Sequence, residues 1–463
     1  MSKKCTFIYT TKYYRMKNTP SSRRQFIKQS TMAAGTLLTM PLVSDAGIFN
    51  TSVDDTIRVA LIGCGGRGTG AAMQAMLSKQ NVKLVAMADA FRDRLDECYN
   101  ALMADDISDW SGTTGNIKDK IMVTEESKFV GFDAYQKAMA LADVVILTTP
   151  PGFRPLHFEA AVNLGKHIFM EKPVATDPAG IKKVLETAEK AKQKKLNVVV
   201  GLQRHYQNSY RELYKRYKDG MIGEIVSAQA WWNNDGVWMN LRKPEMTEME
   251  YQMRNWYYFN WICGDHIVEQ HIHNIDVINW FKGAFPVKAQ GMGGRQVRTG
   301  KEYGEIFDHH YVEFTYADGS ILNSQCRHIK GTQAKVDEFM MGTKGNIYCG
   351  AMRINDRKGG TLFQYDHKLE NNPYQSEHDE LFAAIAKGQY KFADAEHGAM
   401  STMTAILGRM ATYSGQVLDF NKTMNSGFTL QPSRYAWDAD MPSKPDANGY
   451  YPIAVPGVTK YAV

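Results

Sequence analysis

The sequence has little cysteine for its length, and the few cysteines are poorly placed for cross-linking. Six cysteines occur in 463 residues, and no two have Cys-x-x-Cys spacing. Five of them follow residue 46, and one of these, Cys64, lies inside a glycine-rich loop. A disulfide framework and a cysteine-bound metal are therefore not expected. We expect these cysteines to be buried free thiols.

The sequence also lacks a long hydrophobic run. The apolar stretch near the N-terminus, TMAAGTLLTMPLV, has 13 residues, whereas a membrane-spanning helix needs about 20. It follows two adjacent arginines, Arg23 and Arg24, an order typical of a twin-arginine export signal. We expect residues 1–46 to be a cleavable signal peptide, cut near Ala46. This predicts a periplasmic protein that is exported by the twin-arginine route and has no membrane span.

Without residues 1–46, the chain has no large excess of positive or negative charge. The whole chain has a formal net charge of +6, but residues 1–46 contain eight Lys and Arg and only one acidic residue. The remaining chain therefore has a net charge of −1. Such a near-neutral body gives no electrostatic reason to expect nucleic acid or a membrane surface as a partner.

What the sequence does have is a glycine-rich turn between a strand and a helix. Residues 57–62, IRVALI, are apolar and β-branched, Gly63-x-Gly65-x-x-Gly68 follows, and residues 71–77 have helical character. Gly63 permits the tight turn, Gly65 the approach of a pyrophosphate, and Gly68 the close packing of the helix. The arrangement predicts a dinucleotide-binding fold.

A carboxylate after the next strand distinguishes between cofactors. The segment KLVAMAD ends in Asp89, about 20 residues after the glycines. A carboxylate at this place accepts hydrogen bonds from the ribose hydroxyls and repels a 2′-phosphate, so NAD is favoured over NADP. Arg92 nearby is the feature that argues against this choice. A glycine turn with a purely structural role would not explain Asp89.

Two further strands bring polar residues to the same edge of the sheet. DVVILTTP ends in Thr148 and Pro150, and HIFMEKP contains Glu171 and Lys172. Because ligands bind outside the carboxyl ends of strands in doubly wound sheets, these residues are expected in one crevice with the glycine loop. The full set of expected cofactor contacts is Gly63, Gly65, Gly66, Arg67, Gly68, Asp89, Thr148, Pro150, His157, Glu171 and Lys172.

Three motifs together resemble one known family. They are the glycine loop, TTPPGFRPLH and EKPVA, and the likeness to the glucose–fructose oxidoreductase, inositol dehydrogenase and rhizopine-catabolism (Gfo/Idh/MocA) family covers residues 55–420. The resemblance implies an α/β protein with an N-terminal Rossmann domain and a C-terminal α/β domain on an open, mostly antiparallel sheet. It also implies redox chemistry at a hydroxyl-bearing carbon of a sugar or cyclitol, and a homodimer or homotetramer.

The pattern changes after residue 173. Longer β segments alternate apolar and polar residues, as in YVEFTYADGSILNSQC, where Asp-Gly marks a hairpin turn. Residues 378–418 return to a helical pattern. We expect the signal peptide over 1–46, the Rossmann domain over 55–173, the substrate-binding domain over 174–420 and a surface or oligomer-contact tail over 421–463.

The chemistry is expected in the segment GDHIVEQHIHNIDVINWF. Its apolar residues recur at helical spacing, at Val268, Ile272, Ile275, Ile278 and Phe281. Polar residues fall on the adjacent face of the same helix, at His266, Glu269, His273 and Asp276. A metal site is disfavoured because no HExxH motif occurs and His271 and His273 diverge on a helix. A hydrogen-bonded core network is the other alternative.

The family resemblance favours a catalytic role for this helix. The family pattern Asp-x-x-x-His is matched by Glu269 and His273, with the longer Glu in place of the more usual Asp. The resemblance implies that His273 is the base for the hydroxyl proton and that Lys172 holds this hydroxyl or relays the proton. His271, where many relatives have a small residue, is either a sugar contact or a second base.

The surrounding segments suit a carbohydrate. QRHYQ follows a strand, and AQAWWNNDGVW offers aromatic faces for sugar C–H groups and amides for hydroxyls. One of Trp231 and Trp232 is expected to be core instead. The expected substrate contacts are Arg204, His205, Tyr206, Trp232, Asn234 and His266.

These observations predict an NAD-dependent dehydrogenase with tightly bound cofactor. It would oxidise a ring hydroxyl, at position 3, of a sugar, glycoside or disaccharide. A redox-neutral NAD-dependent glycoside hydrolase is the first alternative, and it needs an additional base such as His271 or Tyr206. A non-catalytic sugar-binding protein is the second. The expected partners are the carbohydrate and an electron acceptor or a partner lyase.

Overall fold

A computed structural model describes residues 55–461 of the chain. The expected signal peptide, 1–46, lies outside this range, so the export signal stays a prediction. Within the described range, no helix is long and apolar enough to cross a bilayer. The five cysteines of this range are buried and free, as expected.

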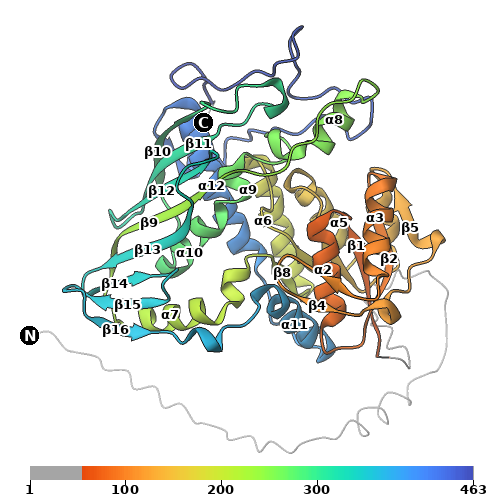
Figure 1. Ribbon diagram of the computed structural model, residues 1–463, viewed down its shortest axis with the longest axis horizontal. Helices are drawn as coiled ribbons and strands as arrows, with labels where there is room; N and C mark the ends of the chain where they lie inside the picture. The colour runs from red at the N-terminus through yellow and green to blue at the C-terminus, as the bar shows by residue number, and fades with distance from the viewer. Residues whose placement is uncertain (1–54, 462–463) are drawn as a thin grey trace, which may run out of the picture. The chain divides into compact units, whose positions relative to one another are not determined.

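Six parallel strands form the N-terminal sheet, in the order β5-β2-β1-β6-β7-β8 (Figure 1). Their bounds are β1 Ile57–Ile62, β2 Val82–Asp89, β5 Lys128–Val130, β6 Val144–Leu147, β7 His167–Met170 and β8 Val198–Val200. Every residue of β6, β7 and β8 is buried. Continuous apolar, β-branched segments of this kind form strands that are covered on both faces.

Helices connect these strands. Their bounds are α2 Gly66–Leu77, α3 Arg92–Leu102, α4 Ala134–Ala140, α5 Arg154–Asn163 and α6 Pro178–Gln193. α2 begins at Gly66, earlier than the expected 71–77, because the glycine loop itself forms the first turn. The end of the Rossmann domain, expected at residue 173, is also placed too early. α6 follows it as a further crossover helix, and β8 then pairs in parallel with β7.

Nine strands form the second sheet, in the order β16-β15-β14-β13-β9-β12-β11-β10-β17. Their bounds are β9 Ile225–Asn234, β10 Lys288–Gly294, β11 His309–Thr315, β12 Ile321–His328, β13 Lys335–Gly342, β14 Gly345–Tyr348, β15 Arg353–Asp356, β16 Thr361–Gln364 and β17 Leu418–Asp419. β9 and β12 are parallel, and the other neighbouring strands of this sheet are antiparallel. Buried residues alternate along β11 and β12, so one face of the sheet is covered.

The remaining helices cover this sheet or join the two halves. Their bounds are α7 Asn208–Lys218, α8 Glu248–Arg254, α9 His266–Glu269, α10 Ile272–Lys282, α11 Pro373–Ala386, α12 Ala395–Ser414 and α13 Phe420–Met424. α12 packs against β10 and β11 and also against α6. α11 packs against α2. A short hairpin of β3 (Ile107–Ser108) and β4 (Thr114–Gly115) completes the regular structure of the described range.

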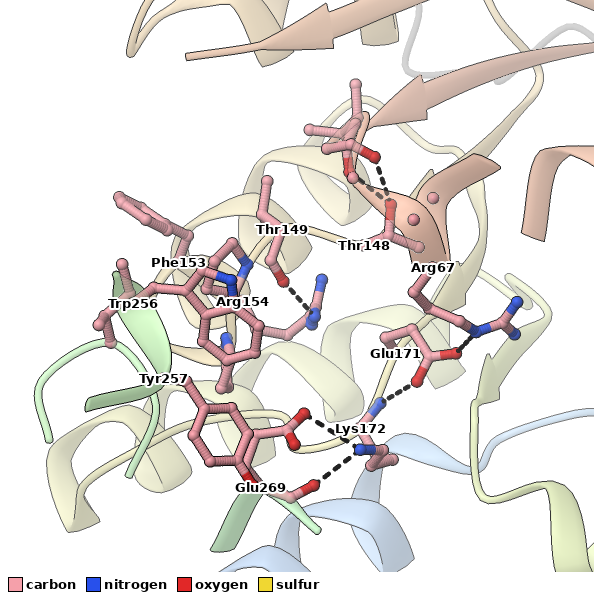
Figure 2. Close-up of a pocket in the computed structure, with 18 of the residues that line it drawn as sticks. Arg67, Thr148, Thr149, Phe153, Arg154, Glu171, Lys172, Trp256, Tyr257 and Glu269 are labelled. Atoms are coloured by element: carbon pink, nitrogen blue, oxygen red, sulfur yellow. Dashed lines mark hydrogen bonds and ion pairs between the residues drawn. The ribbon is translucent and has the colours of Figure 1, made fainter. Parts of the chain in front are cut away.

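The segment expected to be one helix is broken in two. α9 ends at Glu269, α10 begins at Ile272, and Gln270 between them has a φ of −109°. The predicted apolar stripe is nevertheless buried throughout, at Val268, Ile272, Ile275, Ile278 and Phe281. The predicted polar face is only partly present. Glu269 reaches Lys172 (Figure 2) and lines the cleft with His273, whereas His266 contacts Asp265 and Asp276 contacts His205.

The C-terminal tail packs back onto its own chain. The Leu430 N–H donates to Asp177 Oδ2 at 2.8 Å, beside the start of α6. Gln431 Nε2 donates to the Trp261 carbonyl at 2.8 Å and to Thr176 Oγ1 at 2.9 Å. The tail therefore binds residues from both halves. Its expected role at an oligomer contact stays a prediction.

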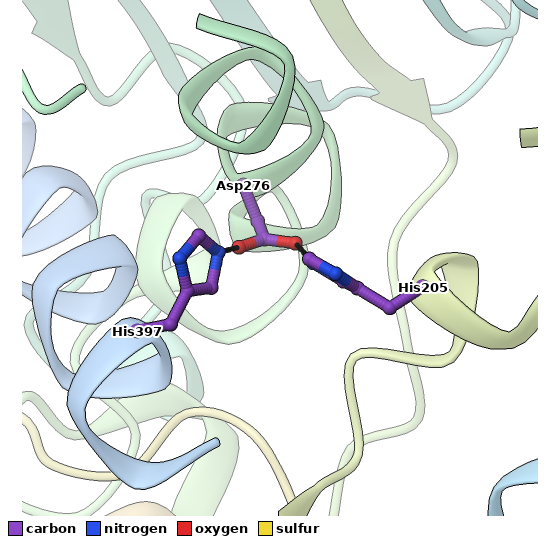
Figure 3. A group of neighbouring side chains, drawn as sticks. All are labelled: His205, Asp276 and His397. Carbon is purple, nitrogen blue, oxygen red and sulfur yellow. Dashed lines mark hydrogen bonds and ion pairs between the residues drawn. The ribbon is translucent and has the colours of Figure 1, made fainter. Parts of the chain in front are cut away.

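Asp276 links three segments through one buried carboxylate. His205 Nε2 contacts Asp276 Oδ2 and His397 Nε2 contacts Asp276 Oδ1, each at 2.7 Å, so the carboxylate lies between two imidazoles (Figure 3). Ser401 Oγ donates to Oδ1 at 2.7 Å. His205 belongs to the short 3₁₀ turn Gln203–Tyr206, Asp276 to α10 and His397 to α12. The cluster fixes the loop after β8 against both helices.

The charges in this cluster shift the pKa values of two members. Burial pushes the pKa of Asp276 upward, but His205 and His397 outweigh it and lower the pKa below 3.8. Burial pushes the pKa of His397 downward, but Asp276 and, more weakly, Asp394 raise it above 6.5. The carboxylate therefore contributes stability above its unfolded pKa of about 3.8. His397 contributes below 6.5 and loses this contribution as the pH rises through its raised pKa.

We expect Asp276→Asn to destabilise the protein most between about pH 4 and 6.5. The loss should be about 2–3 kcal/mol at pH 5, because a charged acceptor of three hydrogen bonds is removed. It should shrink as the pH rises through the raised pKa of His397. Urea unfolding at pH 5 and pH 8.5 measures this difference. Ser401→Ala is the matched control, since it removes a contact to the same oxygen without titrating. A loss from Asp276→Asn that is equal at both pH values would contradict the role given to His397.

Candidate active site

A cleft of about 960 Å³ lies at the carboxyl ends of β1, β2, β6 and β7. Its wall combines the glycine loop with residues of β9 and of the junction between α9 and α10. The crevice expected from the strand ends is therefore present, and Figure 2 shows its central residues. All eleven residues expected to bind the cofactor line this cleft.

The glycines have the backbone geometry that their spacing predicts. Gly63 has a φ of +97°, and a Cβ there would lie 2.5 Å from the Thr149 nitrogen. A Cβ on Gly68 would lie 2.0 Å from the Gly63 carbonyl oxygen. At Gly65 and Gly66 the described residues leave the position of a Cβ open to 4 Å. The N-terminus of α2 thus presents bare backbone to open space, which fits a pyrophosphate.

The carboxylate of Asp89 is hydrogen-bonded to backbone N–H groups, one of them in the glycine loop that it faces. Its Oδ2 accepts the Cys64 N–H at 2.7 Å and its Oδ1 accepts the Phe91 N–H at 2.9 Å. Burial raises the pKa of Asp89, and these two N–H donors oppose the rise. Carboxylate oxygens have lone pairs beyond these two bonds, so ribose hydroxyls fit. Arg92 pairs with Asp96 and Glu125 at the surface instead, and this removes the argument for a 2′-phosphate.

Residues at the end of β6 hydrogen-bond to the glycine loop and to α5. Thr148 Oγ1 donates to the Gly63 carbonyl at 2.7 Å. Thr149 Oγ1 and His157 Nδ1 are 3.0 Å apart. Burial, followed by the charge of Arg154, lowers the pKa of His157 to about 3, so His157 is neutral at physiological pH. These contacts fix the wall of the cleft with uncharged groups.

Arg67 and Glu171 pair with one another across the cleft wall. Arg67 Nε contacts Glu171 Oε1, and Arg67 Nη2 donates to Glu377 Oε1 at 3.1 Å. Glu171 also accepts the Lys172 N–H at 3.1 Å. The guanidinium therefore lies between two carboxylates, and the pair anchors α11 beside the glycine loop.

Lys172 and Glu269 form a nearly buried ion pair between the two halves of the protein. Lys172 Nζ donates to the Glu269 carbonyl at 2.7 Å and to Glu269 Oε1 at 3.1 Å (Figure 2). Their side chains are 11% and 10% exposed. Burial raises the pKa of Glu269, and the charge of Lys172 opposes this. The ammonium group is thereby fixed at the carboxyl end of β7.

His273 lines the cleft as a neutral imidazole. Burial, and then the charges of Lys172 and Arg204, hold its pKa well below the ordinary value of 6.5. Its ring packs nearly parallel to Trp232, with centroids 6.1 Å apart. Its buried Nδ1 has no hydrogen-bond partner among the described residues. A neutral imidazole beside an ammonium group can accept a proton from a hydroxyl that both groups contact.

Arg204 and Trp232 are the predicted substrate contacts that the cleft contains. Arg204 is paired with Glu338, which also accepts from Tyr210 Oη at 2.8 Å and Asn274 Nδ2 at 2.6 Å. Its charge is therefore balanced by a fully buried carboxylate.

Five of the residues predicted to act on or bind the substrate lie outside this cleft, and their contacts or positions explain why. His271 Nε2 bonds Ser324 Oγ at 2.7 Å, and Tyr206 Oη donates to Asp394 Oδ2 at 2.9 Å. His205 is drawn to Asp276. His266 is fully buried against Asp265 because Asp265 caps α9 with a φ of +71°. Asn234 ends β9 and is exposed, beyond the cleft.

The structure adds residues that the sequence did not single out. Tyr257, Trp256 and Gln270 line the cleft beside Lys172 and Glu269. The segment RNWYYFNWIC carries a dense run of aromatic residues, which is the signal available in the sequence. However, nothing in this run distinguishes Tyr257 from the adjacent Tyr258, which does not line the cleft.

Two clusters of His and Asp in the described range bring their ligand-type atoms within 4.8 Å of one another. They are His205, Asp276 and His397, and Asp265, His266 and His310. In both clusters the imidazoles contact the carboxylate as hydrogen-bond partners. Neither lines the cleft, and the expectation of no metal stays a prediction.

Comparisons with known proteins agree with this geometry. Residues 57–200 match the Gfo/Idh/MocA family, described as an oxidoreductase family with an NAD-binding Rossmann fold. An inositol 2-dehydrogenase of Rhizobium meliloti is 24% identical over 345 residues, which cover 72% of this chain and 90% of the relative. A 2,7-anhydro-N-acetylneuraminate hydratase of Escherichia coli is 24% identical over 261 residues, which cover 54% of this chain and 64% of the relative.

A solved structure shares the fold over most of the chain. The scyllo-inositol dehydrogenase of Lactobacillus casei, with bound NAD(H) and scyllo-inositol, has a TM-score of 0.58 at 19% identity. The match covers 79% of this chain and 99% of that one. This confirms the predicted fold class, and the family match together with the open glycine loop confirms NAD as the cofactor. Through residues 57–200, the chain is similar to the NAD-binding domain of the Gfo/Idh/MocA oxidoreductase family.

Proposed function

We propose that this protein is an NAD-dependent dehydrogenase that oxidises a ring hydroxyl of a sugar, glycoside or disaccharide, at position 3. The observation that carries the proposal is the placement of Lys172, Glu269 and His273 together on the cleft that the glycine loop opens. When bound, NAD supplies the acceptor for a hydride. The inositol dehydrogenases among the relatives act on hydroxyl-bearing rings, which supports a substrate of this class.

Each side chain has a defined task in this proposal. The Lys172 ammonium donates a hydrogen bond to the reacting hydroxyl and lowers the cost of removing its proton. His273 accepts that proton, because burial and two nearby cations keep it neutral beforehand. Glu269 holds the ammonium through two contacts and so sets its position.

The remaining wall suits a neutral ring. Trp232, Trp238 and Trp256 offer faces for C–H groups. The cations of the wall are mostly paired with carboxylates, as in Arg204 with Glu338 and Arg67 with Glu171. An anionic substrate would therefore meet little unpaired positive charge. This supports a polyhydroxylated, uncharged substrate.

We further propose that the protein acts in the periplasm with its cofactor already bound. The twin-arginine route moves folded proteins, so export after cofactor loading explains why Arg23 and Arg24 precede a nucleotide-binding domain. The reduced cofactor must then be reoxidised in place, by a second substrate or an electron carrier. A keto product at position 3 acidifies the adjacent C–H and would suit a partner lyase. A homodimer or homotetramer is the proposed assembly.

A redox-neutral glycoside hydrolase is the second candidate. The hydratase among the relatives favours it, since its name implies addition of water. This reaction needs a further base for a carbon-bound proton, and the two residues suggested by the sequence, His271 and Tyr206, lie outside the cleft. A non-catalytic sugar-binding protein is the third candidate, and the presence of Lys172, Glu269 and His273 in one cleft argues against it.

The deciding experiment mixes the mature protein anaerobically with glucosides and disaccharides, without added NAD. We expect bound NADH to rise in a stoichiometric amount and the product to be lighter by two hydrogens. Absorbance and mass analysis of the products measure both. Free sugar without lasting NADH would favour the hydrolase. Neither signal, with the cofactor shown to be present, would contradict both enzymatic candidates for this substrate class.

We expect Lys172→Met to reduce turnover by about 10³-fold while NAD stays bound, because the hydroxyl loses its positioning cation. Single-turnover NADH formation and cofactor occupancy measure the two effects. Since this change leaves the Glu269 charge buried and unpaired, the double variant Lys172→Met/Glu269→Gln serves as the folded control. Unchanged turnover in the folded variants would refute the role of Lys172.

We expect Asp89→Ala to lower NAD affinity by at least about tenfold, because it removes both the ribose acceptor and the contact that fixes the loop. The cofactor retained after gel filtration and the Kd from titration measure this. Arg92→Ala is the matched control and should leave NAD occupancy unchanged, since its side chain pairs at the surface. Full occupancy in Asp89→Ala would rule out its role.

A further inference from the structure

Five residues that line the cleft have a buried polar atom without a hydrogen-bond partner in the described structure: Arg154, Gln203, Tyr257, Glu269 and His273. Two of these atoms are the Tyr257 hydroxyl and Glu269 Oε2. Both residues line the cleft beside Lys172, and the side chain of Tyr257 is only 1% exposed overall. A buried polar atom without a partner destabilises a fold, so such atoms need an explanation, and completion by a bound ligand is one.

The ring of Tyr257 is fixed by its neighbours, although its hydroxyl has no hydrogen-bond partner within the described structure. It lies in the 3₁₀ turn Trp256–Tyr258. Its ring packs parallel to His328, with centroids 5.9 Å apart, and edge-on to Trp238, at 6.4 Å. The Glu269 carboxylate acts electrostatically on the Tyr257 hydroxyl, and Figure 2 labels both residues. Neighbouring rings therefore fix the direction in which the hydroxyl points, without binding it.

The two orphan groups are chemically complementary. Burial, and then the charge of Glu269, raise the pKa of Tyr257 well above 10, so the phenol remains a hydrogen-bond donor. Glu269 uses Oε1 for Lys172, and an ionised carboxylate can only accept at its other oxygen. Within the described structure the donor and the acceptor do not bond to each other. A single hydroxyl can complete both, because it accepts one hydrogen bond and donates another.

We propose that Tyr257 and Glu269 together bind a substrate hydroxyl adjacent to the one that is oxidised, which makes the substrate a ring with two neighbouring free hydroxyls. The inference rests on the proposed function, since Lys172 and His273 define the reacting position. Lys172 contacts Glu269 directly, so the second hydroxyl is the immediate neighbour of the first. Tyr257 thereby determines specificity.

The chemistry of this pair excludes close analogues. An ether at the neighbouring position cannot donate to Glu269, and a methylene can neither donate nor accept. An ammonium group cannot accept from Tyr257. Sites that are built to bind a hydroxyl reject analogues that lack it much more strongly than apolar pockets reject an extra methylene, because buried groups are left unpaired.

Tyr258 provides a matched control from the next position in the chain. Both side chains are buried, at 1% and 2% exposure. The Tyr258 hydroxyl, however, donates to the Trp238 carbonyl at 3.0 Å, and Tyr258 does not line the cleft. Replacing each tyrosine by phenylalanine removes a hydroxyl. In Tyr258 this hydroxyl is hydrogen-bonded, and in Tyr257 it has no partner within the described structure.

The first measurement compares the thermal stability of the full mature protein, loaded with NAD, for the wild type, Tyr257→Phe and Tyr258→Phe. Tyr258→Phe should lower Tm by about 2–4 °C, because a satisfied hydrogen bond is lost. Tyr257→Phe should keep or raise Tm, because the hydroxyl that it removes has no partner within the described structure. An equal loss of Tm in both variants would overturn the premise that the Tyr257 hydroxyl awaits a ligand.

The second measurement uses methyl β-D-glucopyranoside and its 2-deoxy and 4-deoxy analogues as substrates in single-turnover NADH formation. The wild type should reject one of the two analogues by at least about 100-fold in kcat/KM. Tyr257→Phe should lose about 100-fold on the parent glucoside and narrow that gap to about tenfold or less. Tyr258→Phe should retain the wild-type preference. Unaltered rate and preference in Tyr257→Phe would overturn the inference while leaving the proposed function intact.

A separate readout covers the case in which no probe gives NADH, an outcome that would count against the proposed function itself. Saturating methyl β-D-glucopyranoside should raise the Tm of the wild type and of Tyr258→Phe, but not that of Tyr257→Phe. An equal rise in all three proteins, or no rise in the wild type, would overturn the hydroxyl-binding role of Tyr257.

Discussion

The buried ion pair between Lys172 and Glu269 is the interaction on which the site depends. It joins the end of the parallel sheet to α9, a helix of only four residues that would not persist alone. Two charges removed from water need each other, and breaking such a pair from one side costs about 3–5 kcal/mol. The position of the Lys172 ammonium group and the course of α9 are therefore determined together. Neither half of the protein would form this site without the other.

The same principle of pairing extends along the cleft. Arg67 lies between Glu171 and Glu377, and Arg204 is paired with Glu338. Charges are thus numerous in the wall, but they compensate one another locally. Such fixed, paired dipoles need little reorganisation when a neutral ligand enters. Under the proposed function, the hydrogen-bonding atoms of the cleft that have no partner within the described structure would then discriminate between similar rings.

The sequence was informative wherever function depends on local backbone geometry. Gly63 and Gly68 have the roles that their spacing predicts, since a Cβ at either would meet backbone atoms at 2.5 and 2.0 Å. The sequence was uninformative where contacts with distant residues determine the position of a side chain. α9 is capped at its start by Asp265, whose carboxylate is held by the Phe307 N–H at 3.0 Å and by His310 at 3.2 Å, and this carboxylate also contacts His266. Periodicity placed His266 and Glu269 on one face, but it could not show that His266 contacts Asp265 whereas Glu269 contacts Lys172. Nor could it separate Tyr257 from Tyr258.

The attachment of the C-terminal tail restricts how the cleft can open. Residues 428–431 bond to the start of α6 on one side and to the Trp261 carbonyl on the other. A rigid-body hinge rotation of one half away from the other would have to break these bonds together. Entry and exit of small molecules are therefore left to local movements of loops and side chains at the rim. By bonding to both halves of the protein, residues 428–431 limit the relative motion of the halves and leave the cleft to adapt by local changes.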